Sequence, residues 1–259
     1  MIKMIVTDLD ETLLRSDKTI SDYTVSILNK CRDKGIMIAY ATARSRQAVS
    51  RFFERFVPDV FIGYGGAASF VGEEVISRFA IPAEIGFQLI DRCLQEPEIF
   101  YVHASNETVA HTNSLDSPNP EIVHHDCVDF SQLSGISYLK ISLISTNPDV
   151  VGRIASEFPM LDLLRYTGED LYRFADRSAE KWNAVKAVAE YFDIDTDMVA
   201  AFGDDINDLE MVKNCGIGVA VGNAIETVKA AAKYICDTNN NDGVAKWLEE
   251  HILSEESVS

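Results

Sequence analysis

The chain has 259 residues, enough for one large domain or two modest ones with a well-buried core. Hydrophobic residues make up 47% and charged residues 25%, as in ordinary globular proteins, but 41 acidic and 23 basic residues give a net charge of −18. An acidic surface of this kind repels nucleic acids and anionic membranes, so we expect neither as a partner. The five cysteines are widely spaced, with no CxxC motif, and no apolar run reaches the ~18 residues of a membrane span. We therefore expect reduced thiols and a cytoplasmic protein without a leader segment.

The first third of the chain alternates strands with helices. We predict strands at residues 1–8, 36–42 and 59–66 and helices at 21–35 and 45–56. Ser21 is a suitable N-cap for the first helix, and Gly35 is a suitable stop. Such a series of apolar strands separated by helices is typical of a parallel sheet in a doubly wound, Rossmann-like α/β fold.

The pattern changes after residue 67 and returns near residue 178. A hairpin at 68–82 with Gly72 at its tip comes first, and a helix at 83–95 and antiparallel strands at 98–105 and 107–113 follow. Alternating strands and helices resume from residue 178, beginning with a helix that places Trp182, Val185 and Phe192 on one apolar face. We therefore predict a core formed by 1–82 and 178–259, with an inserted α+β domain at 83–177.

Polar residues follow several of the predicted strands. Asp8 and Asp10 end the first strand, Thr42 the second, and Asp204 a later one. In a doubly wound sheet, ligands bind outside the carboxyl ends of the strands, so these side chains are expected at one edge. Carboxylates suit Mg²⁺, a hard cation that prefers oxygen ligands.

The same edge is expected to hold phosphate. The Thr42 hydroxyl and the Lys181 ammonium are groups that bind phosphate oxygens, although a lysine in the first turn of a helix is often only solvated. Asn207 and Asp208 share a face with Asp204 if a helix begins there. The chain has no GxxxxGK[ST] motif, and the stretch GYGGAA at 63–68 is a poor dinucleotide fingerprint because no helix is predicted after it.

Four ordered motifs resemble those of the haloacid dehalogenase (HAD) superfamily of phosphatases, specifically the Cof-type branch with a large α/β cap of the C2B type. They are Asp8-Leu9-Asp10-Glu11-Thr12 for DxDx[TV], Thr42, Lys181, and the Gly203–Asp208 stretch for GDxxND. The resemblance spans nearly the whole chain and identifies residues 83–177 as the cap. Three positions depart from the branch: Ala43 stands where glycine is usual, Gly65 where asparagine is usual, and Trp182 where glycine is usual.

The resemblance implies a mechanism and a role for each motif residue. Asp8 would be the nucleophile that forms an aspartyl-phosphate, and Asp10 the general acid and base, its proton affinity raised by the neighbouring carboxylate. Mg²⁺ would bind Asp8, the Asp10 carbonyl, Asp204 and Asp208. Thr42, Ala43 and Lys181 would hold the phosphoryl oxygens, and Asn207 would orient Lys181 or the metal shell. Glu11 is expected to make only a solvated or helix-dipole contact. The cap residues that are candidates for substrate recognition by type are His103, His111, His124, His125 and Lys140.

These residues predict a Mg²⁺-dependent phosphatase acting on small phosphomonoesters such as sugar phosphates or phosphorylated cofactors, as a monomer or weak homodimer. A phosphohexomutase-type phosphotransferase would use the same chemistry with a sugar hydroxyl in place of water. A signalling receiver has a similar acidic pocket, but in a domain of about half this length and without a residue in the position of Asp10. A catalytically weak binding protein of the same fold is the remaining alternative, because Trp182 lies beside the catalytic lysine.

Overall fold

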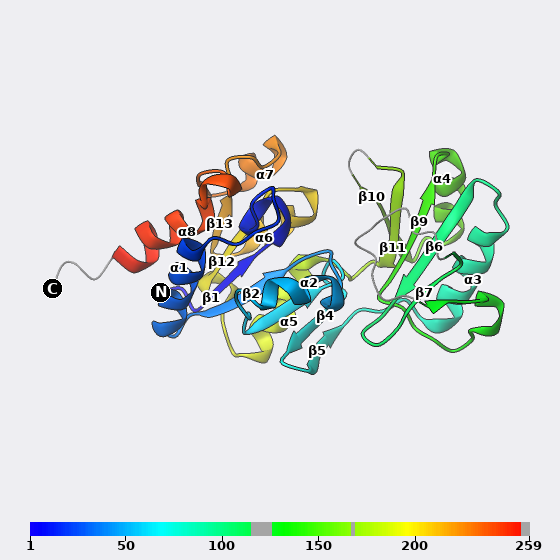
Figure 1. Ribbon diagram of the computed structural model, residues 1–259, viewed down its shortest axis with the longest axis horizontal. Helices are drawn as coiled ribbons and strands as arrows, with labels where there is room; N and C mark the ends of the chain where they lie inside the picture. Colours follow the sequence, from blue (N-terminus) through cyan, green and yellow to red (C-terminus); the bar gives the residue numbers. More distant parts are fainter. Residues whose placement is uncertain (115–125, 167–168, 255–259) are drawn as a thin grey trace. The chain divides into compact units, whose positions relative to one another are not determined.

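The computed structural model describes residues 1–114, 126–166 and 169–254. The chain forms two compact units (Figure 1). The first consists of Met1–Arg44, Val49–Ser77 and the chain from Glu180, and the second of Ser45–Ala48 and Arg78–Ala179. Among the described residues, no helix is both long and apolar enough to cross a membrane.

The first unit is built on an eight-stranded sheet with the order β14-β13-β12-β1-β2-β3-β4-β5. Strands β14 to β3 pair in parallel, and β4 pairs antiparallel with β3. Figure 1 shows the sheet combining strands from both ends of the chain, blue beside yellow and orange. The strands are β1 (Met4–Thr7), β2 (Met37–Ala41), β3 (Val60–Gly63), β4 (Ala68–Val71), β5 (Glu74–Arg78), β12 (Val199–Gly203), β13 (Ile217–Ala220) and β14 (Tyr234–Ile235).

The central strands are apolar throughout because the sheet is covered on both faces. All residues of β1 and β12 are buried, as expected for parallel strands between two layers of helices. On the described chain α1 contacts β2 and α8, while α5 contacts β3, β4 and α6. The helices are α1 (Asp22–Asp33), α2 (Arg46–Phe53), α5 (Lys181–Tyr191), α6 (Leu209–Asn214), α7 (Glu226–Ala231) and α8 (Gly243–Leu248).

Local signals set the ends of several elements as the sequence predicts. The Ser21 side chain accepts a hydrogen bond from the Thr24 amide at the start of α1, and Gly35 follows the helix with φ of 78°. Gly72 lies at the tip of the β4–β5 hairpin with φ of 57°. The doubly wound parallel sheet predicted from the sequence is confirmed.

Two helices differ from expectation. No α-helix begins at Asp204: Ile206–Asp208 is a 3₁₀ turn and α6 begins only at Leu209. On the predicted apolar face of α5, Val185 is buried as expected, but Trp182 and Phe192 are only half-buried and Lys181 is buried instead. The cause is that the Lys181 ammonium has partners inside the unit, whereas the Trp182 ring lies 5.5 Å from the exposed Lys186 ammonium.

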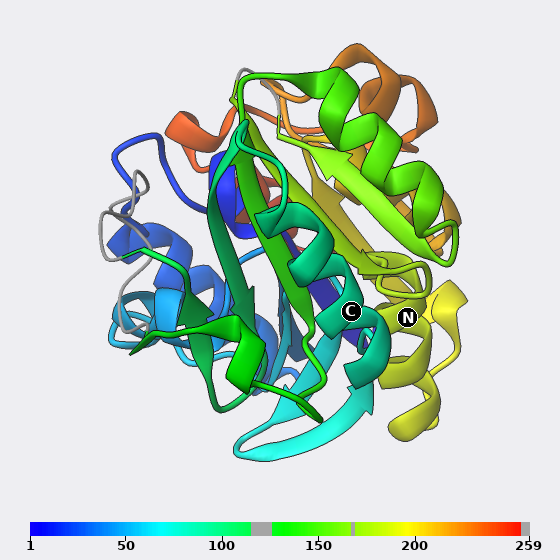
Figure 2. The ribbon, with the colours of Figure 1, turned by 90° about the vertical axis from the view of Figure 1, so that its right-hand side faces the viewer.

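The second unit contains a six-stranded sheet with the order β10-β11-β9-β6-β7-β8. Strands β6 and β7 are antiparallel, which confirms the prediction for that stretch. Helices α3 (Ala83–Leu94) and α4 (Pro148–Glu157) lie on one face of this sheet (Figure 2), and an apolar core lies between them and the strands. The strands are β6 (Ile99–Ser105), β7 (Ala110–Thr112), β8 (Asp126–Cys127), β9 (Lys140–Ser145), β10 (Leu161–Arg165) and β11 (Leu171–Asp176).

Candidate active site

The carboxyl ends of three adjacent parallel strands carry the central polar residues. Strand β1 lies between β12 and β2, so Asp8, Asp204 and Thr42 follow neighbouring strands at the same edge. The Asp8 amide continues the ladder by donating to the Phe202 carbonyl at 3.0 Å. The sheet therefore brings together residues that are nearly 200 positions apart in the sequence.

Lys181 joins two of the carboxylates. From the first turn of α5 its Nζ donates to Asp8 Oδ1 and to Asp208 Oδ1, each at 2.6 Å. All three side chains are buried, with exposed fractions of 4% for Lys181, 6% for Asp8 and 1% for Asp208. Burying a lysine is costly, and here the cost of its desolvation is offset by the two carboxylates. This arrangement indicates a functional site and not a surface contact.

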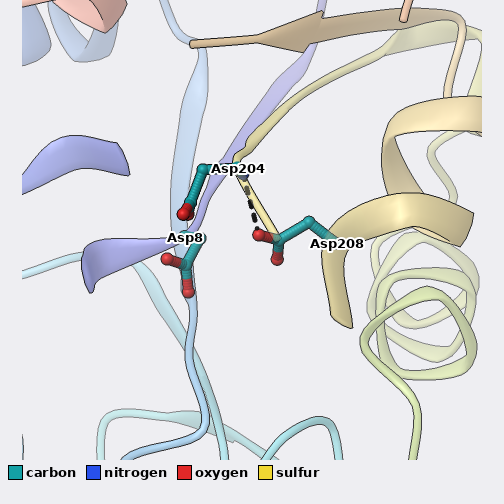
Figure 3. Close-up of side chains that lie close together, drawn as sticks. All are labelled: Asp8, Asp204 and Asp208. Carbon is teal, nitrogen blue, oxygen red and sulfur yellow. Dashed lines mark hydrogen bonds between the residues drawn. The ribbon is translucent and has the colours of Figure 1, made fainter. Parts of the chain in front are cut away.

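Asp208 is fixed by the backbone of its own turn. Its Oδ2 accepts hydrogen bonds from the Asp204 amide at 3.0 Å and from the Asp205 amide at 3.2 Å, and Figure 3 shows the first of these. Gly203 makes the arrangement possible, since a Cβ there would lie 2.3 Å from the Asp208 Cβ. The first glycine of the GDxxND stretch is thus required by space.

Asp8, Asp204 and Asp208 form a group that could hold a divalent cation. One ligand atom from each lies within 4.8 Å of the others, and Figure 3 shows the carboxylates of Asp8 and Asp204 side by side. The Thr12 hydroxyl donates to Asp204 Oδ1 at 2.7 Å and so orients that side chain. Three carboxylates face a single lysine here, and such an excess of oxygen donors fits a hard cation such as Mg²⁺.

The pKa values of this group reflect the excess of negative charge. Burial, together with the charges of Asp208 and Asp204, raises the pKa of Asp8 well above its usual range despite the opposing effect of Lys181. Burial and the Asp208 carboxylate raise the pKa of Asp204 to about 7. Burial favours neutral Lys181, but Asp208 and Asp8 outweigh it and raise the pKa of the ammonium. A cation bound here would favour the charged forms of the carboxylates.

Asp10 has different surroundings, and the expectation that a neighbouring carboxylate raises its proton affinity is wrong for this structure. Arg44 Nε and Nη2 donate to Asp10 Oδ2 and Oδ1 at 2.7 and 2.8 Å, and Lys18 Nζ lies 3.1 Å from Oδ1. Burial acts to raise the pKa of Asp10, but the hydrogen bonds and charges of Arg44 and Lys18 outweigh it and lower the pKa.

The other residues of the predicted phosphate site also follow strands that end at this edge of the sheet. Thr42 is buried directly after β2, where its hydroxyl accepts a hydrogen bond from the Arg44 amide at 3.2 Å. Ala43 is half-buried in the bend that follows. Asn207 is half-buried in the 3₁₀ turn, and the described hydrogen bonds of Lys181 go to Asp8 and Asp208 rather than to it.

The recognition candidates of the second unit lie in different environments. His103 is buried on β6, and Lys140 is half-buried at the start of β9. His111 is buried on β7, where its Nδ1 lies 2.8 Å from the Tyr138 hydroxyl, so it packs within its own unit. His124 and His125 lie outside the described residues.

Sequence reasoning gave no role to Arg44, Lys18 or Thr12. Arg44 stands two residues after Thr42, and Thr12 is the last residue of the first motif, so both lay within stretches already singled out. No pattern in the sequence indicates a role for Lys18. Its contact with Asp10 depends on a loop that turns back at Lys18 itself, which has φ of 62°.

Comparisons with known proteins agree on one family. A sequence model described as haloacid dehalogenase-like hydrolase matches residues 5–248. The 5-amino-6-(5-phospho-D-ribitylamino)uracil phosphatase YitU of Bacillus subtilis is 25% identical, over 96% of this chain and 97% of its own length. A haloacid dehalogenase-like hydrolase from Bacteroides thetaiotaomicron has the same fold, with a TM-score of 0.84 and 24% identity over 96% of this chain and 99% of its own. The HAD subclass IIB sugar phosphatase BT4131 has a TM-score of 0.81 and 24% identity over 96% and 98%.

Proposed function

The chain belongs to the haloacid dehalogenase-like hydrolase family and is a phosphatase of the Cof type, and from this premise we propose that it is a Mg²⁺-dependent enzyme that hydrolyses small phosphomonoesters through an aspartyl-phosphate on Asp8. The observation that carries the proposal is the buried contact of Lys181 with both Asp8 and Asp208, beside Asp204. A nucleophilic carboxylate needs such a cation nearby when a phosphate dianion approaches.

The acidic group supports a role for Mg²⁺. Asp8, Asp204 and Asp208 would hold the ion, together with the Asp10 carbonyl, and Asn207 would support its shell. When bound, the ion neutralises charge on the phosphoryl oxygens and keeps Asp8 ionised. Thr42, Ala43 and Lys181 would bind the remaining phosphoryl oxygens. Thr42 and Ala43 come directly after β2.

The first step would transfer the phosphoryl group to Asp8. A carboxylate oxygen of Asp8 attacks phosphorus, the bond from phosphorus to the ester oxygen breaks, and Asp10 gives its proton to that oxygen. This step requires a proton on Asp10 against the effect of Arg44 and Lys18. We infer that an anionic substrate draws one of these cations away from Asp10 when it binds.

The second step would release phosphate and restore the enzyme. Asp10, now a carboxylate, takes a proton from water as the water oxygen attacks phosphorus, and the bond to Asp8 breaks. The ion pairs that Asp10 makes with Arg44 and Lys18 in the structure suit this basic form. The second unit would act as the cap that supplies substrate contacts and excludes water.

The names of the relatives guide the choice of substrates. One acts on a phosphorylated ribitylamino-pyrimidine and another on sugar phosphates, so both classes belong in the test. Phosphate release from a panel of phosphomonoesters should require Mg²⁺ and should be lost with EDTA or in Asp8→Asn. Isomerised sugar phosphate without free phosphate would instead indicate a phosphotransferase, and no reaction from the folded protein would contradict the proposal.

A further inference from the structure

The residue after the proposed acid and base has more partners than a solvated glutamate. Glu11 has φ of 57°, in the left-handed region that is unusual for a residue with a Cβ. Its carboxylate accepts hydrogen bonds from the Ser16 hydroxyl at 3.0 Å, the Lys18 ammonium at 3.1 Å and the side-chain amide of Asn239 at 3.1 Å. Glu11 is thus half-exposed, as a solvated residue would be, but its carboxylate also has three partners within the protein. A strained residue held by this many groups has a conformation set by its surroundings.

Two asparagines from the end of the first unit complete the arrangement. Asn223, just after β13, donates from Nδ2 to the Glu11 carbonyl at 2.7 Å. The Oδ1 atom of Asn223 accepts a hydrogen bond from the backbone amide of Asn239 at 3.0 Å. Asn239 is 2% exposed, and its Nδ2 also donates to the Leu14 carbonyl at 3.0 Å. These bonds tie Glu11 and Leu14 of the turn at residues 9–14 to segments more than 200 positions away.

The Glu11 network, which we define as Glu11, Lys18, Asn223 and Asn239, reaches Asp10 directly. Lys18 Nζ lies 3.1 Å from Glu11 Oε1 and 3.1 Å from Asp10 Oδ1, so Glu11 fixes one of the two cations that hold Asp10. The same loop that carries Asn223 also contacts the metal candidates, since the Ile225 amide donates to the Asp204 carbonyl at 2.9 Å. Asp10 and Asp204 are thus placed by one set of loops.

We propose that Glu11, Asn223 and Asn239 are positioning residues that hold the turn after Asp10 and so aim the Asp10 carboxyl group at the leaving oxygen. The inference rests on the proposed function, because it assumes that Asp10 is the general acid. It gives a role to Asn223 in the stretch VGNA at 221–224 and to Asn239 in the stretch NNND at 239–242.

The test uses the different needs of two leaving groups. An alkyl phosphate leaves as a strongly basic alkoxide that needs the proton of Asp10, whereas p-nitrophenolate leaves unprotonated. We would compare kcat/KM, which reports the phosphorylation step, for an alkyl phosphate and p-nitrophenyl phosphate. The variants are Asn239→Asp, which places an acceptor where two donor bonds are needed, and Glu11→Gln at the half-exposed end of the network.

We expect both variants to lose about tenfold in kcat/KM for the alkyl ester, part of the ~10²–10⁴ that a general acid supplies, and less than about twofold for the aryl ester. Asn241→Asp is the matched control, because Asn241 lies in the same loop but bonds to Asp237 instead of Glu11. It should leave the ratio of the two esters unchanged. If Asn239→Asp does not fold, Glu11→Gln decides.

Asp10→Asn separates the two levels of the proposal. If Asp10→Asn loses the alkyl ester selectively but the network variants reduce both esters equally or neither, the network does not position Asp10 and the inference is overturned. If Asp10→Asn itself shows no selective loss, the acid role of Asp10 fails first. Selective loss in all three variants, with Asn241→Asp unaffected, supports both.

Discussion

Asp8 and Asp10 are two residues apart and meet opposite electrostatic surroundings. Burial and the carboxylates of Asp208 and Asp204 raise the pKa of Asp8, whereas Arg44 and Lys18 overcome burial and lower the pKa of Asp10. The chain leaves β1 after Thr7 and turns at residues 9–13, and this turn lets Asp8 contact Lys181 while Asp10 contacts Arg44 and Lys18. Two identical residues thereby acquire the different tasks that a two-step transfer needs.

The raised pKa of Asp204 has a consequence for the stability of the metal-free protein. Its pKa moves from 3.8 to about 7 through burial, Asp208 and Asp205, partly opposed by Thr12 and Lys181. Between these values the folded protein binds more protons than the unfolded chain, so this residue stabilises below pH ~4 and the contribution is lost as the pH rises to about 7. Urea unfolding in EDTA should show that loss in the wild type.

Asp204→Asn provides the comparison for this residue. The variant has no proton to lose there, so its free energy of unfolding should fall less between pH 4 and pH 7 than that of the wild type. Because the Asp204 charge also raises the pKa of Asp8, its removal lowers that pKa and makes the fall in the variant smaller still. Parallel stability curves across this range would contradict the assigned pKa of Asp204.

At the scale of elements, the position of Lys181 depends on a close approach of two backbones. The turn between β3 and β4 brings Gly66 against the start of α5, and a Cβ at Gly66 would lie 2.3 Å from the Glu180 carbonyl carbon and 2.7 Å from the Lys181 amide. Gly66 also has φ of 99°. Gly66 of the GYGGAA stretch therefore serves this packing.

Gly66→Ala should therefore displace the first turn of α5 and with it Lys181. We expect at least a tenfold loss of phosphate release, since a shift near 1 Å can cost ~10²-fold, and a destabilisation of about 2–4 kcal/mol from strain and overpacking. Gly72→Ala is the matched control: it has φ of 57° but nothing within 4 Å of the added Cβ. It should cost about 1–2 kcal/mol and leave activity intact. Equal activity in the two variants would show that Gly66 does not place Lys181.

The sequence predicts those elements whose signals are local. The apolar runs of β1 and β12, the Ser21 cap and the hairpin at Gly72 all depend on neighbouring residues, and each is found as expected. The order of the motifs along the chain also predicts that Lys181, Asp8 and Asp208 belong to one site, and the three side chains are in contact. The contacts of Glu11 with Asn223 and Asn239 could not be predicted, because they join loops more than 200 residues apart without a recognisable pattern.

For the molecule as a whole, charge is distributed unevenly. The chain carries a net charge of −18, yet Lys18, Arg44 and Lys181 all contact carboxylates of the candidate site. An anionic substrate approaches a repulsive surface, so these cations and a bound metal have to make the site locally attractive. This supports small phosphomonoesters, and not nucleic acids, as substrates.

Metal binding should be visible in the stability of the whole protein. A cation that binds the folded state alone stabilises by about 2.7 kcal/mol at a hundred times its Kd, which for a chain of this length raises Tm by roughly 5–10 °C. Calorimetry with and without Mg²⁺ checks this. Asp208→Asn should abolish the shift, whereas Asp205→Asn, which keeps the cap of the 3₁₀ turn, should retain it. An equal shift in both variants would place the metal elsewhere.

In the proposed mechanism Asp8 carries the phosphoryl group between the two steps. The most direct measurement mixes the enzyme with Mg²⁺ and a reactive phosphomonoester, quenches in acid within the first turnover, and maps protein-bound phosphate by mass spectrometry. We expect phosphate on the peptide containing Asp8, more of it in Asp10→Asn because hydrolysis is slowed, and none in Asp8→Asn. Turnover of the ester without any phosphorylated Asp8, or phosphate bound at another residue, would contradict it.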